Sequence, residues 1–345
     1  MRKSATLLIL ISLTLSLSLP VLYGGLRGFS ELRRLPAWAI PLLLFMVVLG
    51  WCCNAARLML LANRLGVRIR PLHALSTVIS TEFAWSATPA GSGGPPTYVF
   101  LLRHHGLPIA RGAAMGTVDQ FVDLIFFTTS VPIAFFVSAL NSRIGHPGAL
   151  ALLVSALMIT GVGMLVWLFR QHRKIALWIG RLSNHVVRLR KARFRMARWL
   201  IQFRHTVRLL ISMGMRRLSL LYLFCVMHWV LRYSILPILL WFVGKPLSWG
   251  YLFVAQIILN LVGIVTFLPG GGGGVELGFG AFLRSHLDPA LLAFILVTWR
   301  FCTFYWYLLA GAPVFALTTG KMAGRLVSVG TRKHAPKRGG DARRS

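Results

Sequence analysis

The sequence predicts an all-α polytopic membrane protein with about six full spans and two glycine-broken hairpins arranged as an inverted repeat. Three observations support this prediction. The chain is 56% hydrophobic with a mean hydropathy of +0.70, several apolar runs reach the roughly 20 residues that cross a bilayer, and two glycine-rich breaks interrupt long apolar stretches. The full spans are expected near residues 5–23, 38–61, 112–138, 149–169, 218–243 and 289–319.

The first apolar run follows Arg2 and Lys3, as the core of a signal peptide would. It is longer than a typical signal-peptide core, and no A-x-A-like cleavage site precedes Tyr23. We therefore expect a retained first span.

The two breaks have similar composition, with proline followed by several glycines. The first covers residues 89–96 and the second residues 269–274, and the second begins 180 residues after the first. Proline and glycine interrupt helices, and lipid cannot satisfy the backbone groups that such a break exposes. Two breaks of this kind in two halves of one chain are typical of transporters built from repeats. Residues 74–102 and 249–286 are therefore expected to form broken hairpins, either re-entrant or fully spanning.

An ungapped alignment of Pro89 with Pro269 supports the repeat. Three glycines of the first break then fall on three glycines of the second, and both halves share the order apolar arm, break, short arm, polar patch, long span, proline. The expected halves are residues 38–138 and 218–319, joined by residues 139–217. All of these belong to one transmembrane domain over residues 1–320, and a basic, disordered tail follows over residues 321–345.

The net charge of +31 is concentrated in two regions. The segment 170–217 holds fourteen Lys or Arg and no acid, and the tail from Lys321 to Arg344 holds eight more. The positive-inside rule places both regions, and the N-terminus, in the cytoplasm of a bacterial inner-membrane protein. The hairpins then enter from opposite faces, as an inverted repeat requires.

Apolar residues recur among the basic ones in segment 170–217 at mixed three- and four-residue steps, which predicts one or two amphipathic helices on the cytoplasmic face. Such a face attracts anionic lipid head groups. A simple connector between the two halves is the alternative. Nucleic-acid binding is excluded because the basic residues border the spans and no nucleic-acid motif is present.

The sequence indicates no cofactor, metal ion or catalytic machinery. The four cysteines lie in apolar runs without zinc-site spacing, and the ten histidines show no ligand pattern. Neither glycine run ends in the G-K-[ST] that a phosphate-cradling loop needs. We therefore expect a protein that is not an enzyme and holds no cofactor; without a nucleotide site, active transport would depend on an ion gradient.

Several charged residues lie inside the expected spans, where each costs at least about 2.5–3.5 kcal/mol. Asp119 and Asp123 are four residues apart and share one helical face. We expect one of them, with Glu276, to lie close to Arg300 in one polar site. Arg57 is expected to snorkel from the cytoplasmic end of its span. The candidate substrate-binding residues are Glu82, Gly93, Gly94, Asp119, Asp123, Arg232, Gly271, Gly273, Gly274, Glu276 and Arg300.

Several of these candidates have a structural alternative. Arg232 and Arg300 suit a buried ion pair as well as a site, and Glu276 suits a helix N-terminal cap. The glycines could form a surface loop, although their apolar flanks favour a break that lines a cavity. In a cavity, unwound backbone N–H groups and helix N-termini would suit an anionic head group.

The run Phe267–Glu276, the earlier Pro- and Gly-rich stretch and Arg300 resemble the lysylphosphatidylglycerol synthase transmembrane family, also called flippase-like. The resemblance covers roughly residues 5–320. It implies lipid translocation or handling rather than lysyl transfer, because this chain has no room for the separate soluble domain that attaches the amino acid. The first motif departs from the family pattern, since residues 92–96 stand where Arg or Glu is often found.

The expected function is therefore to translocate or handle an amphipathic lipid, with the head group in a polar cavity between the hairpins. The repeat further suggests alternating access to the two faces. The alternative is a membrane-embedded enzyme, or an accessory subunit, in polar-lipid, hopanoid or polyprenyl-lipid metabolism. The lipid cargo, the direction of transport, the energy coupling and the oligomeric state stay open.

Overall fold

The computed structural model describes residues 35–140 and 190–333, residues 18–23, and positions 14, 16, 33, 156 and 163. Within this part of the chain the structure is helical, apart from turns, short connections and one isolated β-bridge. The expected span 149–169, residues 170–189 and the end of the tail lie outside the described residues, apart from the two isolated positions. So does most of the expected span 5–23.

The expected spans and hairpin arms are all helices where the structure describes them. The order is α2 (Ala39–Arg64), α3 (Pro71–Ala87), α4 (Gly94–His104), α5 (Ile109–Leu140), α8 (Arg190–Ile211), α9 (Met215–Phe242), α10 (Trp249–Val265), α11 (Gly274–Leu283), α12 (Pro289–Arg300), a π-helical turn at Phe301–Tyr305, and α13 (Trp306–Lys333). Among the residues that the structure describes, three helices are long and apolar enough to cross a membrane: Ala39–Arg64, Met215–Phe242 and Pro289–Gly320. The expected span 112–138 is the continuous helix α5, which is not one of these three.

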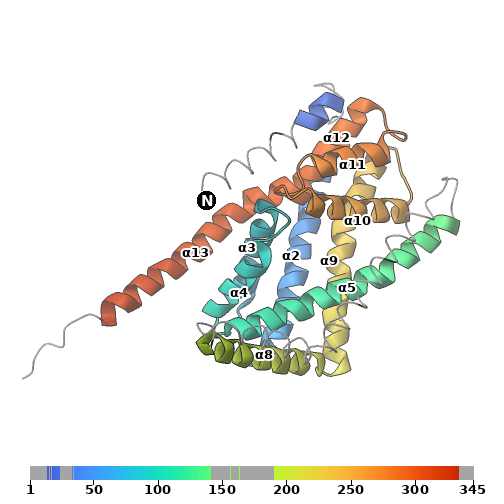
Figure 1. Ribbon diagram of the computed structural model, residues 1–345. Coiled ribbons are helices and arrows are strands. Elements are labelled where there is room, and N and C mark those ends of the chain that lie inside the picture. The colour runs from blue at the N-terminus through green and yellow to red at the C-terminus, as the bar shows by residue number, and fades with distance from the viewer. Residues whose placement is uncertain are drawn as a thin grey trace, which may run out of the picture.

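Helices α2 and α9 pack side by side and antiparallel at the centre of the molecule, and α8 lies across one end of them (Figure 1). At the α8 end, Nε of Arg64 donates to the carbonyl oxygen of Leu209 over 3.3 Å. At the opposite end, the rings of Trp38 and Phe242 are 5.0 Å apart. The basic helix α8 thus forms the part of the expected amphipathic segment that the structure describes, with Leu210 fully buried.

The two hairpins repeat the same backbone plan at the expected offset. Helix α4 begins at Gly94 and α11 at Gly274, and α5 and α12 begin at Ile109 and Pro289. The first tip (residues 88–93) and the second tip (residues 268–273) meet through an antiparallel bridge between their prolines. Gly91 and its counterpart in the second tip have φ angles of 70° and 69°. A left-handed conformation of this kind favours glycine. The two tips therefore share both their glycine content and their backbone conformation.

The hairpins reach this meeting point from opposite ends of the bundle (Figure 1). The open end of α3–α4 lies next to α8, where Arg103 and Arg198 line one groove. Helix α10 instead begins just after α9 ends, at the end far from α8. There the Tyr251 hydroxyl donates to the carbonyl oxygen of Phe282 over 2.7 Å and joins α10 to α11.

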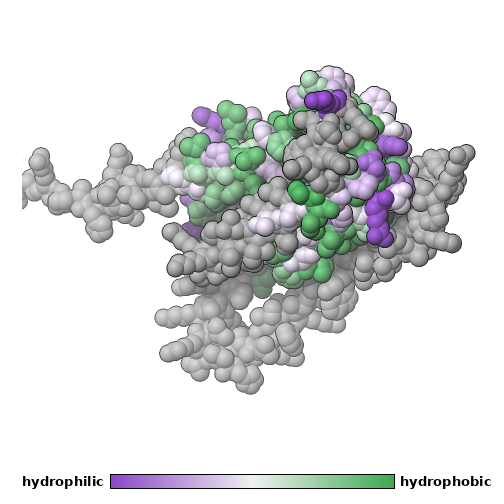
Figure 2. Space-filling model, turned by 90° about the horizontal axis from the view of Figure 1, so that it is seen from above, coloured by the Kyte–Doolittle hydropathy of each residue, from purple (hydrophilic) through white to green (hydrophobic). Residues whose placement is uncertain are grey.

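The described surface carries many large apolar side chains. Seen from the α11–α12 end, it is hydrophobic over much of its area, with hydrophilic residues gathered mostly near the edge (Figure 2). Exposed examples around the bundle are Phe45, Ile133, Trp241, Leu309 and Leu317. A surface of this kind is unfavourable in water and suits contact with lipid acyl chains.

Candidate functional site

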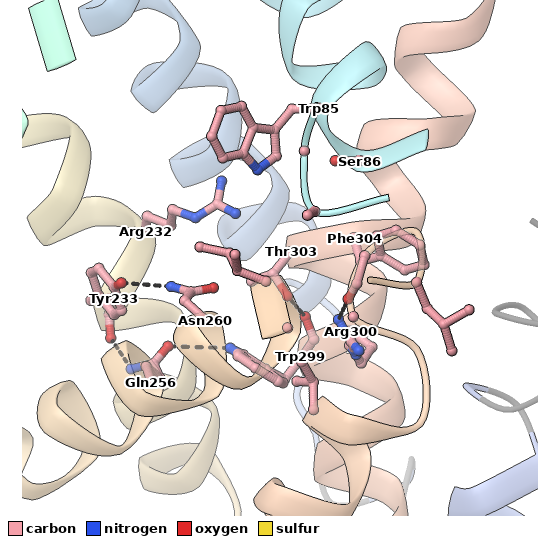
Figure 3. A pocket seen from close by; sticks show the side chains of 18 residues that line it. Trp85, Ser86, Arg232, Tyr233, Gln256, Asn260, Trp299, Arg300, Thr303 and Phe304 are labelled. Atoms are coloured by element: carbon pink, nitrogen blue, oxygen red, sulfur yellow. Dashed lines mark hydrogen bonds between the residues drawn. The ribbon is translucent and has the colours of Figure 1, made fainter. Parts of the chain in front are cut away.

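A polar pocket lies where the two hairpin tips meet. Its volume is about 100 Å³, which holds a few water molecules or one small polar group. Both tips contribute backbone, through Gly91 of the first and Gly270 and Gly271 of the second. The polar side chains come from four helices and the π-helical turn: Ser86 from α3, Arg232 and Tyr233 from α9, Gln256 and Asn260 from α10, Arg300 from α12, and Thr303 from the turn (Figure 3).

Hydrogen bonds fix one wall of this tip pocket before any ligand binds. Asn260 donates to the Tyr233 hydroxyl over 2.7 Å, and Gln256 donates to the Tyr233 carbonyl oxygen over 3.0 Å. The indole N–H of Trp299 donates to Oε1 of Gln256 over 3.2 Å (Figure 3). The wall is therefore a connected network, and such preorganisation reduces the entropy lost when a ligand is held.

Arg232 supplies a positive charge to the tip pocket. Its Nη1 donates to the Tyr307 hydroxyl over 2.7 Å, and its guanidinium carbon lies 4.9 Å from the centre of that ring. No carboxylate lies within 4.0 Å of it among the residues that the structure describes. Arg232 thus lines the pocket with Tyr307, rather than a described carboxylate, as its direct partner.

Glu276 and Arg300 form a buried ion pair behind the second tip. Nε and Nη2 of Arg300 both lie 2.7 Å from Oε1 of Glu276, whose side chain is 0% exposed. Glu276 also accepts the backbone N–H of Gly273 over 2.7 Å and the hydroxyl of Ser16. Nη1 of Arg300 donates to the carbonyl oxygen of Gly270 over 2.9 Å. The pair therefore caps α11 and fixes the second tip, so Glu276 both lies beside Arg300, as expected, and acts as the helix cap.

The expectation for Arg57 is wrong, and so is the position expected for the two aspartates. Arg57 does not snorkel to an interface: its side chain is 1% exposed. Its Nη2 lies 2.7 Å from Asp119 and its Nη1 lies 2.8 Å from Asp123. The carboxylates share Arg57, whereas Arg300 pairs with Glu276. We call Arg57, Asp119 and Asp123 the aspartate cluster.

The remaining candidates surround the tip pocket without all lining it. Glu82, on α3, is half-buried, and its strongest electrostatic attraction to a cation is to Arg232. Gly271 lines the pocket. The other candidate glycines form the starts of the short helices: Gly93 and Gly94 at α4, and Gly273 and Gly274 at α11.

Sequence reasoning missed most of the uncharged wall. Gln256 and Asn260 are two amides four residues apart in the otherwise apolar helix α10. That spacing puts them on one face, and polar residues at membrane depth usually face a cavity or partner, so this pair was a detectable signal. Tyr233 and Tyr307 carried no such signal, because tyrosine is common in apolar helices.

The fold and the site define a polytopic helical membrane protein in which two glycine-broken hairpins meet at a polar pocket. The family model for the lysylphosphatidylglycerol synthase TM region matches residues 9–311, and the chain belongs to this family. The chain is also 26% identical, over 282 residues, to a "UPF0104 membrane protein" from Archaeoglobus fulgidus, which covers 80% of this chain and 85% of that protein. The family resemblance in the sequence is thus confirmed.

Proposed function

We propose that this protein translocates an amphipathic lipid and holds its anionic head group in the tip pocket. The observation that carries the proposal is Arg232, a cation that lines the pocket without a direct carboxylate partner in the part of the chain that the structure describes. Asn260 and Thr303 add hydrogen-bonding groups beside it. Membership in a lipid-related membrane family supports a lipid as the ligand.

The arrangement of the hairpins suits movement between two faces. The hairpins come from opposite ends of the bundle and meet at their tips, where the pocket lies. An inverted repeat with re-entrant hairpins would expose the pocket alternately to each leaflet. In this proposal the protein lies in a bacterial inner membrane, with α8 and both termini on the cytoplasmic side, as the positive-inside rule requires.

Helix α8 supports this orientation and adds a contact with anionic lipid. It contains no acid, and its Arg198 lies beside a groove of about 450 Å³. Arg103, Arg198 and Trp199 line that groove. Basic residues near an anionic leaflet contribute about 1 kcal/mol each, so α8 would hold this end of the bundle at the cytoplasmic surface.

A liposome assay tests the proposal. Purified protein is reconstituted with a fluorescent phosphatidylglycerol, and dithionite quenching of the outer leaflet measures transfer. We expect Arg232→Gln to lower the rate at least about tenfold, because a charge-assisted contact contributes about 1.5–3 kcal/mol. Arg216→Gln, an exposed site on the same helix, is the matched control and should retain the rate.

Two outcomes would contradict the proposal. Equal rates for the two variants would remove Arg232 from lipid recognition. Mass spectrometry of the liposome lipids provides the second readout. A chemically altered head group would favour the enzymatic alternative over translocation.

A further inference from the structure

The aspartate cluster holds two carboxylates for one cation. Asp119 and Asp123 both bind Arg57, over 2.7 and 2.8 Å, and the exposed fractions of their side chains are only 22% and 13%. One guanidinium neutralises one carboxylate. Since an uncompensated charge in a low-dielectric interior is very unfavourable, such a group takes up a proton instead.

The hydrogen bonds separate the roles of the two acids. Oδ1 of Asp123 lies 2.8 Å from Arg57, 2.9 Å from the indole nitrogen of Trp229 and 3.2 Å from the sulfur of Cys225. Three converging donors suit a carboxylate that acts only as an acceptor. Asp119 meets the single group Arg57 Nη2, which also donates to the Asp119 carbonyl oxygen over 3.0 Å. Asp119 is therefore the acid with capacity for a proton.

The wider surroundings keep the same imbalance. Among the described residues, the charged and titratable groups around the aspartate cluster are Cys53 on α2, Glu82 on α3, Tyr98 on α4, and Cys225, His228 and Arg232 on α9. Counting Glu82 and Arg232 with the cluster gives three acids against two cations. One proton restores neutrality.

Two polar atoms at the cluster point to a route for that proton. Nε of the buried Arg57 and the hydroxyl of Tyr98 have no hydrogen-bond partner among the described residues. The Tyr98 ring packs at Gly116, three residues before Asp119 on α5. Unpaired donors beside a carboxyl group would accommodate water molecules or exchange a proton.

Helix α9 connects the aspartate cluster to the tip pocket. Trp229 contacts Asp123, and Arg232 lines the pocket three residues later, one helical turn away. The rings of Trp229 and Tyr233 stack with centroids 5.6 Å apart. A negative head group at Arg232 therefore adds charge one turn from an acid-rich cluster, and by linkage each event changes the free energy of the other.

We propose that the carboxyl group of Asp119 binds a proton together with an anionic head group in the tip pocket, so that lipid movement is linked to proton movement. The proton comes from water, forms an O–H bond at Asp119 and neutralises its charge, and it returns to water when the head group leaves. The proton site depends on the aspartate cluster alone, whereas its coupling to lipid rests on the proposed function.

Infrared difference spectra of the full-length protein test the proton site. Between about pH 6 and 9, a range around neutrality, the wild type should lose the C=O stretch of a protonated carboxyl group. Asp119→Asn should lack this band, while the exposed helix-cap variant Asp288→Asn should retain it. Asp119→Glu keeps an acid and should shift the band without removing it.

The contrary results are equally distinct. No titrating band in the wild type overturns the proton site, and this readout needs no variant to fold. A band that persists in Asp119→Asn assigns the proton elsewhere and also overturns it.

The coupling is tested separately, in liposomes that contain fluorescent phosphatidylglycerol and an imposed pH gradient. The gradient should change the wild-type rate several-fold, and Asp119→Asn should abolish that dependence. A wild-type rate that ignores the gradient overturns the coupling. If no lipid moves while the infrared band titrates, the proposed function fails but the proton site stands.

Discussion

Replacing Glu276 with glutamine isolates the contribution of one buried charge. Glutamine keeps an oxygen that can still accept the N–H of Gly273, so the cap of α11 survives the change. The guanidinium of Arg300, 5% exposed, then has no charge partner in the described structure. Breaking a buried pair in this way typically costs about 3–5 kcal/mol. We expect a loss of that size in the free energy of unfolding.

A double-mutant cycle separates pair formation from local damage. Arg300→Gln should cost a similar amount, because it leaves Glu276 charged and fully buried. The double variant removes both charges, so the two losses should fall short of additivity by about 2–3 kcal/mol. Asp288→Asn is the matched acid-to-amide control. It caps α12 through the N–H of Leu291, and asparagine caps as well as aspartate.

The measurement is unfolding by SDS in mixed micelles, followed by tryptophan fluorescence. The reasoning fails if Glu276→Gln loses less than about 1 kcal/mol, no more than a typical neutral hydrogen bond contributes. Additive single losses would also refute it. Either outcome would mean that the second tip is held by its backbone hydrogen bonds alone.

Three further predictions concern the second tip, the connection between α4 and α5, and helix α8. Gly271→Ala should cost roughly 3 kcal/mol or more, since its φ is 69° and a Cβ would lie 2.4 Å from Cα of Gly263. Gly106→Ala has a φ of 89° but open space, so it should cost only about 1–2 kcal/mol in the same assay; equal losses would contradict the clash. Burial, with two neighbouring histidines, lowers the pKa of His105. The unfolded chain thus binds more protons than the folded protein at low pH, so the melting temperature should fall as the pH drops below about 6.5. His105→Gln should make this fall smaller. A pH dependence that is the same in the variant and the wild type would contradict this. Arg198→Gln should weaken binding of short-chain phosphatidylglycerol to the detergent-solubilised protein about five-fold, for a loss of about 1 kcal/mol, and equal affinities would exclude the α8 groove.

Local sequence signals determined most of the helical plan. Apolar length predicted α2, α5, α9 and the long α12–α13 segment, because a membrane helix is defined by its own composition. Proline and glycine predicted the breaks, since their effect on the backbone is local. Even the repeat is local in origin: the same residue types at a 180-residue offset begin the short helices at Gly94 and Gly274.

The Glu276–Arg300 pair could also be predicted from the sequence, for a related reason. The two residues lie in the second hairpin and the helix that follows it, and a deep acid and a deep base in adjacent elements have few other partners. The candidate glycines were likewise predictable as a group. Which of them line the pocket was not, because that depends on how the two tips meet.

Only the tertiary structure decided which cation serves the two aspartates and which residues surround the tip pocket. Helices α5 and α9 are apolar on nearly every side, so their periodicity does not indicate which face meets α2 or the hairpins. The sequence predicted that Asp119 and Asp123 share one face of α5, and the packing of α5 against α2 brings that face into contact with Arg57. It also placed Arg232 inside a span, but only the meeting of tips from opposite ends of the bundle made it part of a pocket. Composition sets which segments are helices, whereas long-range packing sets which side chains of those helices meet.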